Sequence, residues 1–286
     1  MSFQLPPFVT EQALRDLKES GTQTSLPTVF IASYPKSGTT WLQACTFHIL
    51  SDGKIPLTHI SDFSPFAEVS KTWDEAGRLK YTESHTRLGW HIFNTHLLPS
   101  HIPVNDNIKY IYVVRSGKDV AVSFFHHLSN QIGDGGGLDV EFNAYLRDWC
   151  SGNVIYGSWL KHLEEWIPHA NRHLDGRNIL YVRYEDLKRD LPRELQRIAT
   201  FLRPGFPLGV DRLRELTAIC GFEQMKSSHH LYQPVSVAWK PGFNFLRRGE
   251  VGDNNFGEME NAQFNSMVNQ TFPVIPEWLV ELDVLS

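Results

Sequence analysis

The 286-residue sequence predicts an α/β fold: a single domain, residues 1–286, with a central parallel sheet flanked by helices. Four short apolar segments have the length and the β-branched or aromatic content that is typical of buried strands. Helix-length segments separate them, and strands joined by crossover helices pair in parallel. No internal repeat, linker or low-complexity tract divides the chain. The predicted strands are 28–33, 90–95, 109–114 and 178–183.

The first predicted strand leads into the turn around which the chain is organised. Residues 28–33 form an apolar run bounded by prolines, which is typical of a short buried strand. Residues 39–50 predict a helix that places Leu42, Thr46 and Ile49 on one face. A strand that turns sharply into a helix directs free backbone N–H groups at one point, where the helix dipole favours an anion.

The turn also carries side chains that suit a phosphate-binding loop. Lys36 supplies a positive charge, and Ser37, Thr39 and Thr40 supply hydroxyl groups. The pattern differs from the common nucleoside triphosphatase loop, because the first glycine of that motif is missing and Lys36 precedes Gly38. An ordinary strand–helix turn is the alternative interpretation of these residues taken alone.

The rest of the chain alternates predicted helices and loops. We expect the first helix to end at Gly21, a residue that commonly terminates helices. Residues 55–66 are punctuated by proline and predict an irregular loop, and four glycines within 133–137 predict a flexible one. The predicted helices are 10–20, 119–128, 156–167 and 191–202.

A candidate functional residue follows each predicted strand: Lys36, His96, Arg115 and Tyr184. Ligands bind at the carboxyl ends of parallel strands, so we expect these side chains to converge. The guanidinium fork of Arg115 suits a phosphate group. Each residue also has a structural alternative: an ion pair of Arg115 with Asp119, a buried structural histidine at His96, and a packed aromatic ring at Tyr184.

Composition narrows the class of protein. The net charge of −5, without blocks of like charge, argues against a general nucleic-acid binder. Three widely spaced cysteines, Cys45, Cys150 and Cys220, show no metal-binding pattern and indicate a reduced compartment. The N-terminus does not resemble a signal peptide, and no apolar run is long enough to span a membrane. We therefore expect a cytoplasmic protein without metal, nucleic-acid or membrane partners.

The eight residues from Tyr34 to Trp41 read Tyr-Pro-Lys-Ser-Gly-Thr-Thr-Trp. This string resembles the 5′-phosphosulfate loop of the cytosolic sulfotransferases, which use 3′-phosphoadenosine 5′-phosphosulfate (PAPS). The segments 114–123 and 245–253 resemble the two parts of that family which hold the 3′-phosphate. The segments 181–187 and 220–226 resemble those that contact the adenine. The resemblance covers roughly residues 27–253, with its motifs in family order.

This resemblance implies PAPS as cofactor, adenosine 3′,5′-bisphosphate (PAP) as its product, and no metal. The family pattern then assigns a cofactor-binding role to matching positions of this chain. Trp41 and Phe222 would flank the adenine, Tyr184 would contact it, and Lys36 would be catalytic as well. The implied cofactor-binding residues are Lys36, Ser37, Gly38, Thr39, Thr40, Trp41, Arg115, Ser123, Tyr184, Phe222, Arg247, Arg248 and Gly249.

The segment 94–99, Asn-Thr-His-Leu-Leu-Pro, resembles the family's Lys-Thr-His-Leu-Pro, whose histidine is the general base. The match is His96, and Asn94 replaces the usual lysine, which removes a charge. Candidate acceptor-binding residues are His96 and Asn94 of this segment, together with Phe66 and Phe142, aromatic residues for which core packing is the alternative interpretation. Further candidate walls are Phe63, Tyr81, Phe124 and Tyr145, for which core packing is the alternative, and the segment 227–244 is a candidate lid.

Together these motifs predict transfer of a sulfuryl group from PAPS to a hydroxyl, or an amine, of a small-molecule acceptor by in-line displacement. A kinase-like phosphotransferase is the rival enzyme, but its standard loop and metal-binding aspartate are missing. A nucleotide-binding module without turnover is the other alternative, because Asn94 departs from the family pattern. The family's C-terminal dimerisation motif is also absent, so we expect a monomer or a dimer through another surface.

Overall fold

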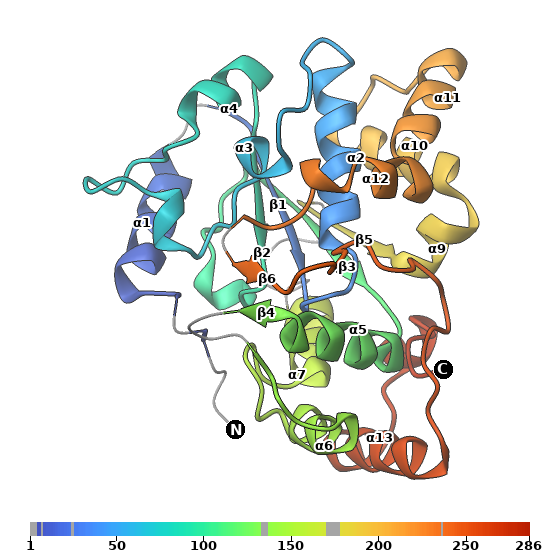
Figure 1. The fold of residues 1–286 in the computed structure, drawn as a ribbon. Coiled ribbons are helices and arrows are strands. Elements are labelled where there is room, and N and C mark those ends of the chain that lie inside the picture. The colour runs from blue at the N-terminus through green and yellow to red at the C-terminus, as the bar shows by residue number, and fades with distance from the viewer. Residues whose placement is uncertain (1–4, 7, 24–25, 133–136, 170–177, 236) are drawn as a thin grey trace.

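A four-stranded parallel sheet of order β2-β1-β3-β5 forms the centre of the molecule (Figure 1). The computed structural model describes residues 5, 6, 8–23, 26–132, 137–169, 178–235 and 237–286. The predicted α/β fold is confirmed, and the start of each strand lies within one residue of the prediction. The strands are β1 (Thr28–Ser33), β2 (His91–Thr95), β3 (Ile108–Val114) and β5 (Ile179–Arg183).

The register of the sheet brings the carboxyl ends of the four strands to one edge. Ala32 of β1 pairs with Thr95 of β2, and Ser33 pairs with Val113 of β3. Val114 in turn pairs with Arg183 of β5. Because the strands are parallel and end at matching positions, the residues that follow them emerge on the same side of the sheet.

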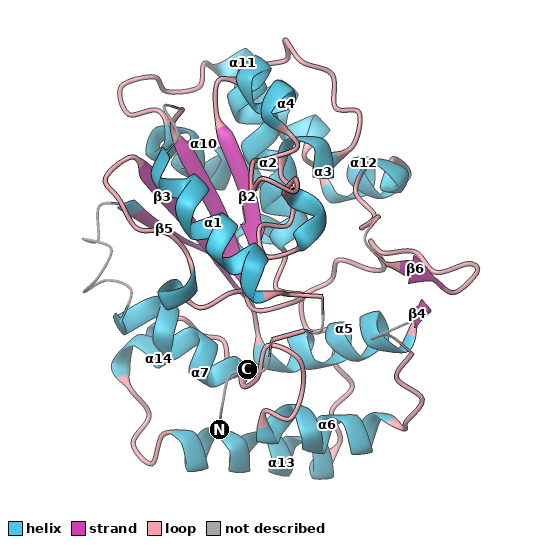
Figure 2. Cartoon of the chain, turned by 90° about the vertical axis from the view of Figure 1, so that its left-hand side faces the viewer, coloured by secondary structure: helices cyan, strands magenta, loops and turns pink. Residues whose placement is uncertain are grey.

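Side chains that alternate along each strand fill two separate cores. Val29 and Ile31 of β1 pack beneath α2 (Thr39–Ser51), α10 (Leu191–Leu202) and α11 (Val210–Ile219). Phe30 and Ala32 point to the opposite face, where Figure 2 shows α1 lying across the sheet. Burying each such side chain contributes about 1.5–3 kcal/mol relative to leaving it exposed.

The core that contains Phe30 and Ala32 receives helices that, apart from α1, come from the later part of the chain. These are α1 (Glu11–Gln23), α5 (Gly117–Ser129), α6 (Phe142–Ser151), α7 (Trp159–Glu164) and α13 (Glu258–Thr271). Three indole rings, those of Trp149, Trp159 and Trp166, are fully buried there. This half of the molecule supports α5, the helix that follows β3 and faces the carboxyl edge of the sheet (Figure 1).

Helix α2 is buried nearly all round, which the predicted single apolar face did not anticipate. Eleven of its thirteen residues are buried, because the sheet, α10, α11 and α3 (Ile60–Phe63) surround it. Among its buried polar side chains, the Gln43 amide donates to the Ser64 carbonyl oxygen at 3.0 Å, whereas the hydroxyls of Thr46 and Ser51 have no hydrogen-bond partner among the described residues. The helix that follows the turn after β1 is therefore held rigidly.

Several predicted boundaries were wrong. Helix α1 continues past Gly21 to Gln23. The loop predicted at 55–66 contains α3, where the His59 ring accepts a hydrogen bond from the Ser61 N–H at 3.1 Å. The helix predicted at 156–167 starts only at Trp159, since Tyr156 and Gly157 have left-handed backbone conformations. Of the predicted glycine-rich loop, residues 133–136 lie outside the described residues.

Shorter elements complete the fold. Helix α7 continues into a π-helical turn, η3 (Glu165–His169). None of the described helices is both long and apolar enough to cross a membrane. The remaining elements are α4 (Thr82–Leu88), α9 (Tyr184–Arg189), α12 (Phe222–Ser227), α14 (Glu277–Glu281), β4 (Gln131–Ile132), β6 (Ala238–Trp239), η1 (Ser70–Thr72), η2 (Pro99–His101) and η5 (His229–Leu231).

The contact between α5 and its neighbours yields a stability prediction. A Cβ atom at Gly117 would lie 2.6 Å from Cη2 of Trp159 and 2.9 Å from Cε2 of Phe264. Gly117→Ala should therefore lower the free energy of unfolding by about 1–3 kcal/mol through overpacking, measured by urea titration. Gly209→Ala is the control, because nothing lies within 4 Å of its Cβ position. Equal losses in the two variants would contradict tight packing at Gly117.

Candidate functional site

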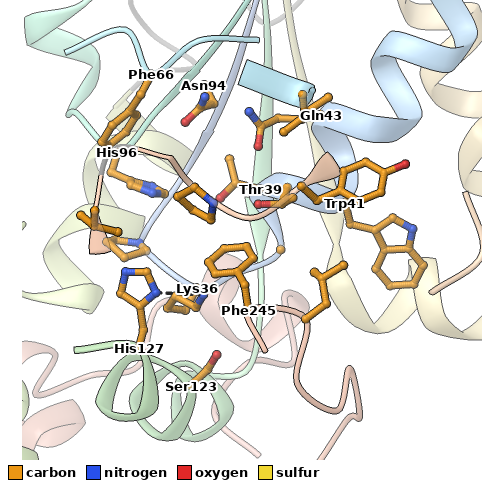
Figure 3. A pocket seen from close by; sticks show the side chains of 18 of the residues that line it. Lys36, Thr39, Trp41, Gln43, Phe66, Asn94, His96, Ser123, His127 and Phe245 are labelled. Atoms are coloured by element: carbon orange, nitrogen blue, oxygen red, sulfur yellow. Dashed lines mark hydrogen bonds between the residues drawn. The ribbon is translucent and has the colours of Figure 1, made fainter. Parts of the chain in front are cut away.

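A cavity of about 300 Å³ opens at the carboxyl edge of the sheet (Figure 3). It joins residues that follow all four strands with residues from α5 and from the C-terminal segment. Most of the candidate residues from the sequence line it. They are Lys36, Gly38, Thr39, Thr40, Trp41, Phe66, Asn94, His96, Arg115, Ser123, Tyr184, Phe222, Arg247, Arg248 and Gly249.

Two of the predicted site residues do not line the cavity. The Ser37 side chain is 1% exposed beneath the loop, and its N–H donates to the Tyr34 carbonyl oxygen at 3.3 Å. Phe142 is not a cavity wall, which corrects the prediction. Its ring packs 5.2 Å from Phe125 and 6.0 Å from Phe256, because α6 rests on α5 and α13 away from the carboxyl edge.

The other candidate aromatic walls divide in the same way. Tyr81 and Phe124 line the cavity. Phe63 and Tyr145 are buried in the two cores instead, as the packing alternative predicted. From the candidate lid 227–244, the cavity receives Tyr232, Pro234, Val235 and Val237.

The turn between β1 and α2 has the backbone geometry of an anion cradle. Lys36 has φ 70° and Gly38 has φ 114°, so the chain reverses sharply before α2 begins. The N–H groups in the first turn of a helix have no intrahelical acceptor and are available to a ligand. A Cβ at Gly38 would lie 2.8 Å from Cδ2 of Tyr184, so this position requires glycine.

Lys36 is a partly buried cation among other cations. Its Nζ lies 3.9 Å above the centre of the Phe245 ring and 3.3 Å from Nδ1 of His127. Burial, with the nearby charges of Arg115 and Arg247, lowers the pKa of Lys36 to about 7. An anion entering the cavity would relieve both the desolvation and the repulsion, so the site favours a negatively charged ligand.

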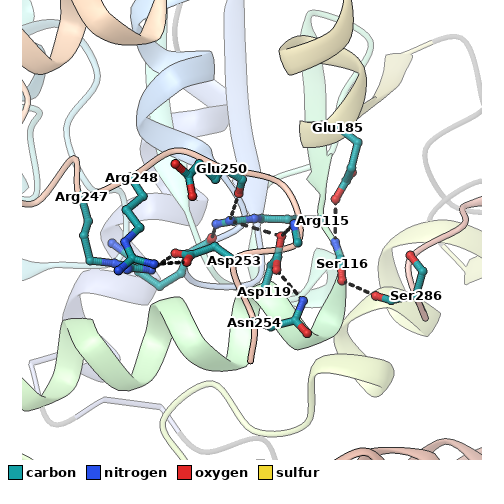
Figure 4. A network of polar contacts seen from close by, with 12 residues as sticks. Arg115, Ser116, Asp119, Glu185, Arg247, Arg248, Glu250, Asp253, Asn254 and Ser286 are labelled. Carbon is teal, nitrogen blue, oxygen red and sulfur yellow. Dashed lines mark hydrogen bonds and ion pairs between the residues drawn. The ribbon is translucent and has the colours of Figure 1, made fainter. Parts of the chain in front are cut away.

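Arg115 is held in the cavity wall by several acceptors (Figure 4). Its two terminal nitrogens donate to the carbonyl oxygens of Lys36, at 3.3 Å, and Glu250, at 3.1 Å. The ion pair with Asp119 also forms, at 3.5 Å, so this structural role coexists with a place at the cavity. Its buried Nε has no hydrogen-bond partner among the residues that the structure describes. The guanidinium lies 4.3 Å from the centre of the Tyr184 ring.

In the cationic loop, residues 245–254, one aspartate pairs with the two arginines, and Asp119 of α5 fastens the loop to that helix (Figure 4). Asp253 accepts from Arg247 and, at 2.6 Å, from Arg248. Asp119 accepts from the Gly252 N–H at 2.9 Å and from the Asn254 amide at 2.8 Å. The cationic loop is therefore fixed to the start of α5, next to Arg115.

Three aromatic side chains form one end of the cavity. The Trp41 ring lies 5.5 Å from Tyr184 and 6.1 Å from Phe222, in edge-to-face arrangements. The Trp41 Nε1–H donates to the Cys220 carbonyl oxygen at 2.7 Å, which fixes the indole. A Cβ at Gly249 would overlap the Phe222 ring, so glycine lets the loop pack closely. This end offers apolar faces to a planar ring beside the arginines.

His96 has a defined tautomer. Its Nδ1–H donates to the Ser33 carbonyl oxygen at 2.7 Å, which leaves the Nε2 lone pair as the proton acceptor. Burial lowers the pKa of His96 to about 4, so the imidazole is neutral at physiological pH. The ring packs edge-on against Phe66 at 5.4 Å and Tyr156 at 5.3 Å.

A carboxylate that the sequence motifs did not identify, that of Glu68, holds the backbone of His96 in place. Glu68 is fully buried and accepts the His96 backbone N–H at 2.8 Å and the Tyr156 hydroxyl at 3.3 Å. Burial raises the pKa of Glu68 to about 7. His162 completes the support by donating from Nε2 to the His96 carbonyl oxygen at 3.1 Å. The sequence signal that could have identified Glu68 is an acidic residue two positions after Phe66, between Ala67 and Val69.

The Asn94 side chain forms a hydrogen bond with the protein backbone. Its amide donates to the Ser64 carbonyl oxygen at 2.7 Å, and its position pairs with Phe66 as a parallel bridge. Sequence reasoning also missed His127, Gln131 and Phe245 on the cavity wall. The spacing of His127, four residues after Ser123 on a predicted helix, places both on one helical face and could have identified it.

Comparison with known proteins identifies a common family. Residues 26–273 match the family model described as the sulfotransferase domain. Sulfotransferase 1C2 of Rattus norvegicus is 31% identical over 255 residues, which cover 85% of this chain and 82% of that protein. Sulfotransferase 1B1 of Mus musculus is 32% identical over 254 residues, which cover 84% and 80%.

Solved structures with this fold agree. The crystal structure of mouse sulfotransferase SULT7A1 complexed with PAP has a TM-score of 0.73 and 27% identity, and the match covers 98% of this chain and 95% of that one. Retinol dehydratase in complex with androsterone and the inactive cofactor PAP has a TM-score of 0.70 and 25% identity, with 93% and 87% covered.

The buried histidines of the site predict a loss of stability in acid. Burial lowers the pKa of His96 to about 4 and that of His162 to about 3, and both return to about 6.5 in the unfolded chain. The unfolded chain therefore binds more protons, and the stability present above pH 6.5 is lost as the pH falls toward 4. Glu68 has a raised pKa and therefore has the opposite effect on stability, but it is one group against two histidines.

We expect the free energy of unfolding to fall between pH 6 and pH 5 by roughly 1.4 kcal/mol per pH unit for each such histidine. Urea titrations at the two pH values measure this change. His162→Asn should reduce the slope, because it removes one of the groups that must take up a proton. Unfolding curves that coincide at pH 6 and pH 5 would contradict the neutral state of these rings in the folded protein.

Proposed function

Because the chain belongs to the cytosolic sulfotransferase family, it transfers the sulfuryl group of PAPS to a small-molecule acceptor, and we propose that His96 is the general base of this reaction. We further propose that Lys36 stabilises the leaving phosphate. The observation that carries both roles is their placement on one cavity, after the neighbouring strands β1 and β2.

The hydrogen-bond donors of the cavity suit an adenosine that carries phosphate groups at its 5′ and 3′ positions. The Lys36 loop offers N–H groups and the hydroxyls of Thr39 and Thr40 to the 5′ end. Arg115, with its unsatisfied buried Nε, is available to a 3′-phosphate together with the residues of the cationic loop. The residues that would bind the 3′-phosphate are Arg115, Ser123, Arg247, Arg248 and Gly249.

The adenine would occupy the aromatic end of the cavity, against Trp41, Tyr184 and Phe222. When bound, PAPS supplies an activated sulfuryl group and a phosphate leaving group. Lys36 donates hydrogen bonds to the developing charge on the leaving oxygen, a role in which a preorganised cation is most effective. The cavity thus separates the cation that faces the leaving group from the base that faces the acceptor.

His96 holds the proton that leaves the acceptor. Its Nδ1–H is committed to the Ser33 carbonyl oxygen, so Nε2 takes the proton from the acceptor hydroxyl or amine as that group attacks sulfur in line. The same carbonyl oxygen then stabilises the imidazolium. The hydrogen bond of Glu68 to the His96 N–H keeps the ring at the end of β2.

The acceptor side of the cavity is mainly apolar and aromatic. Phe66 packs against His96, and Ile60, Val69, Tyr81 and Ile155 continue the wall. A hydrophobic small molecule with an accessible hydroxyl suits this surface, and an amine is the alternative nucleophile.

Ligand choice tests the assignment of the 3′-phosphate site. PAP should raise the melting temperature much more than adenosine 5′-monophosphate, without added metal. Only PAP carries a phosphate for the Lys36 loop and a second phosphate for Arg115 and the cationic loop. Arg248→Ala should weaken PAP binding by about 1.5–3 kcal/mol and leave binding of the monophosphate unchanged. Arg189→Ala, whose side chain pairs with Asp186 outside the cavity, is the control. Equal shifts from the two ligands would remove the assignment.

Substitution of His96 separates proton removal from cofactor binding. His96→Ala should reduce turnover with a hydroxyl acceptor by about 10²–10⁴-fold and leave PAP affinity nearly unchanged. Lys36→Ala should lower both turnover and affinity. The kcat/KM of the wild type should rise with pH through the His96 pKa of about 4, since the base must be deprotonated. If His96→Ala keeps most of its turnover at saturating PAPS, His96 is a structural histidine.

A further inference from the structure

A second histidine, His127, lies beside the Lys36 ammonium (Figure 3). The Lys36 Nζ is 3.3 Å from His127 Nδ1, which is its hydrogen-bonding partner among the described side chains. Its other close neighbour is the face of the Phe245 ring, at 3.9 Å. Arg115 and Arg247 repel the Lys36 charge from two further sides. His127 is therefore the polar side chain that offers this partly buried cation an acceptor.

His127 is itself held in one orientation. Its ring packs 5.0 Å from Trp239 and 5.9 Å from Phe245. Its Nε2 is 2.8 Å from the side-chain amide of Gln131, which is buried. Gln131 belongs to β4 and pairs there with Trp239 of β6, so the neighbours of the imidazole share one small sheet. Both ring nitrogens of His127 thus have protein partners, whereas His96 is hydrogen-bonded to described residues through Nδ1 of its ring.

The charge of Lys36 determines which nitrogen of His127 carries the proton. A neutral imidazole has one donor and one acceptor. A charged Lys36 needs Nδ1 as acceptor, and Nε2–H then donates to the Gln131 amide oxygen. A neutral Lys36 can accept from Nδ1–H, and the Gln131 amide then donates to Nε2. The amide of Gln131 serves both states by rotating, since its oxygen and nitrogen occupy equivalent positions.

On the basis of the function proposed above, we propose that His127 is a positioning residue for Lys36. Its Nδ1 accepts a hydrogen bond from the Lys36 ammonium and holds this cation at the phosphate-binding loop before the cofactor arrives, while Gln131 fixes the opposite ring nitrogen. The ammonium is thereby kept charged and oriented in a site that would otherwise favour the neutral amine. Preorganisation of this kind lowers the cost of stabilising charge in the transition state.

Other charged groups lie near Lys36 and His127 and influence the pKa values of both. Lys36 faces Arg115 after β3, Arg247 in the cationic loop, and His96 after β2. His127 faces Lys36 and His96, and both disfavour its protonation, so burial and these charges keep the pKa of His127 well below its usual value. His127 therefore remains a neutral acceptor at the pH values at which Lys36 carries its charge.

The pH dependence of PAP binding tests this role. PAP selects the charged form of Lys36, so wild-type affinity should decline above pH 7. In His127→Leu the cation has lost its acceptor, and PAP should bind about tenfold more weakly than to the wild type at pH 8 but within threefold at pH 6. His127→Asn, whose amide oxygen can replace Nδ1, should stay within threefold at both. Titration calorimetry measures these affinities, with Lys36→Ala as the baseline for ionisation of PAP itself.

Two further variants control for a structural effect. His126→Leu removes the preceding histidine of α5, whose ring packs on Phe125, and should leave the pH profile unchanged. His127→Gln places its amide near the position of Nε2, so it should behave like His127→Leu and serves in its place if that variant does not fold. A profile of His127→Leu that equals the wild type, or an equal weakening at both pH values, would overturn the proposal.

Nitrogen-15 NMR of the histidine side chains offers a test in the wild-type protein. The two His127 nitrogens should exchange their protonated and unprotonated chemical shifts as Lys36 titrates near pH 7. A single tautomer throughout this range would contradict the role of His127. Both measurements use PAP or the free protein, so they remain informative if no acceptor is sulfated, an outcome that would count against the proposed function alone.

Discussion

Buried positive charge is the constraint on which the organisation of this protein depends. Arg115 is buried and Lys36 is partly buried, and Arg247 and Arg248 lie beside them around the same cavity. Such a group of cations is costly in the absence of an anion. The structure offsets the cost locally: Asp119 and Asp253 pair with the arginines, backbone carbonyl oxygens accept from Arg115, and aromatic faces lie against Lys36 and Arg115. Binding of a ligand with two phosphate groups can then draw on cations that are already in place.

The fold provides this arrangement through the edge of a parallel sheet. Matching strand ends deliver Lys36, His96, Arg115 and Tyr184 to one side, and α5 begins directly after β3. The loop 245–254 returns from far along the chain and is fastened there by Asp119. Lys36 and His96, the proposed leaving-group cation and base, reach the cavity from neighbouring strands, so their separation is maintained by hydrogen bonds within the sheet. A rigid frame of this kind suits a reaction that relies on positioning rather than on a flexible catalytic group.

Local signals were sufficient for the sheet and for the sharp turn between β1 and α2. The apolar runs predicted the strands to within one residue at their starts, and the string from Tyr34 to Trp41 identified both the turn and the family. The predictions for Phe142 and Gly21 were wrong for a physical reason. An aromatic residue suits a cavity wall and a helix contact equally well, and a glycine near a helix end does not terminate it when neighbouring residues continue the backbone pattern. Neither choice is encoded in the nearest residues.

The amino-acid sequence alone determined three things: the succession of strands and helices along the chain, the composition of the predicted anion-binding loop, and the candidate base. All three depend on residues that are neighbours in the sequence. Tertiary structure alone decided which partners those residues meet. Glu68 reaches the His96 N–H across 28 residues, and His127 reaches Lys36 across 91. The protonation states of Lys36, Glu68 and His96 follow from burial and from charges that come together only in the folded molecule. Such effects depend on distance in space, which the spacing of residues along the chain does not specify.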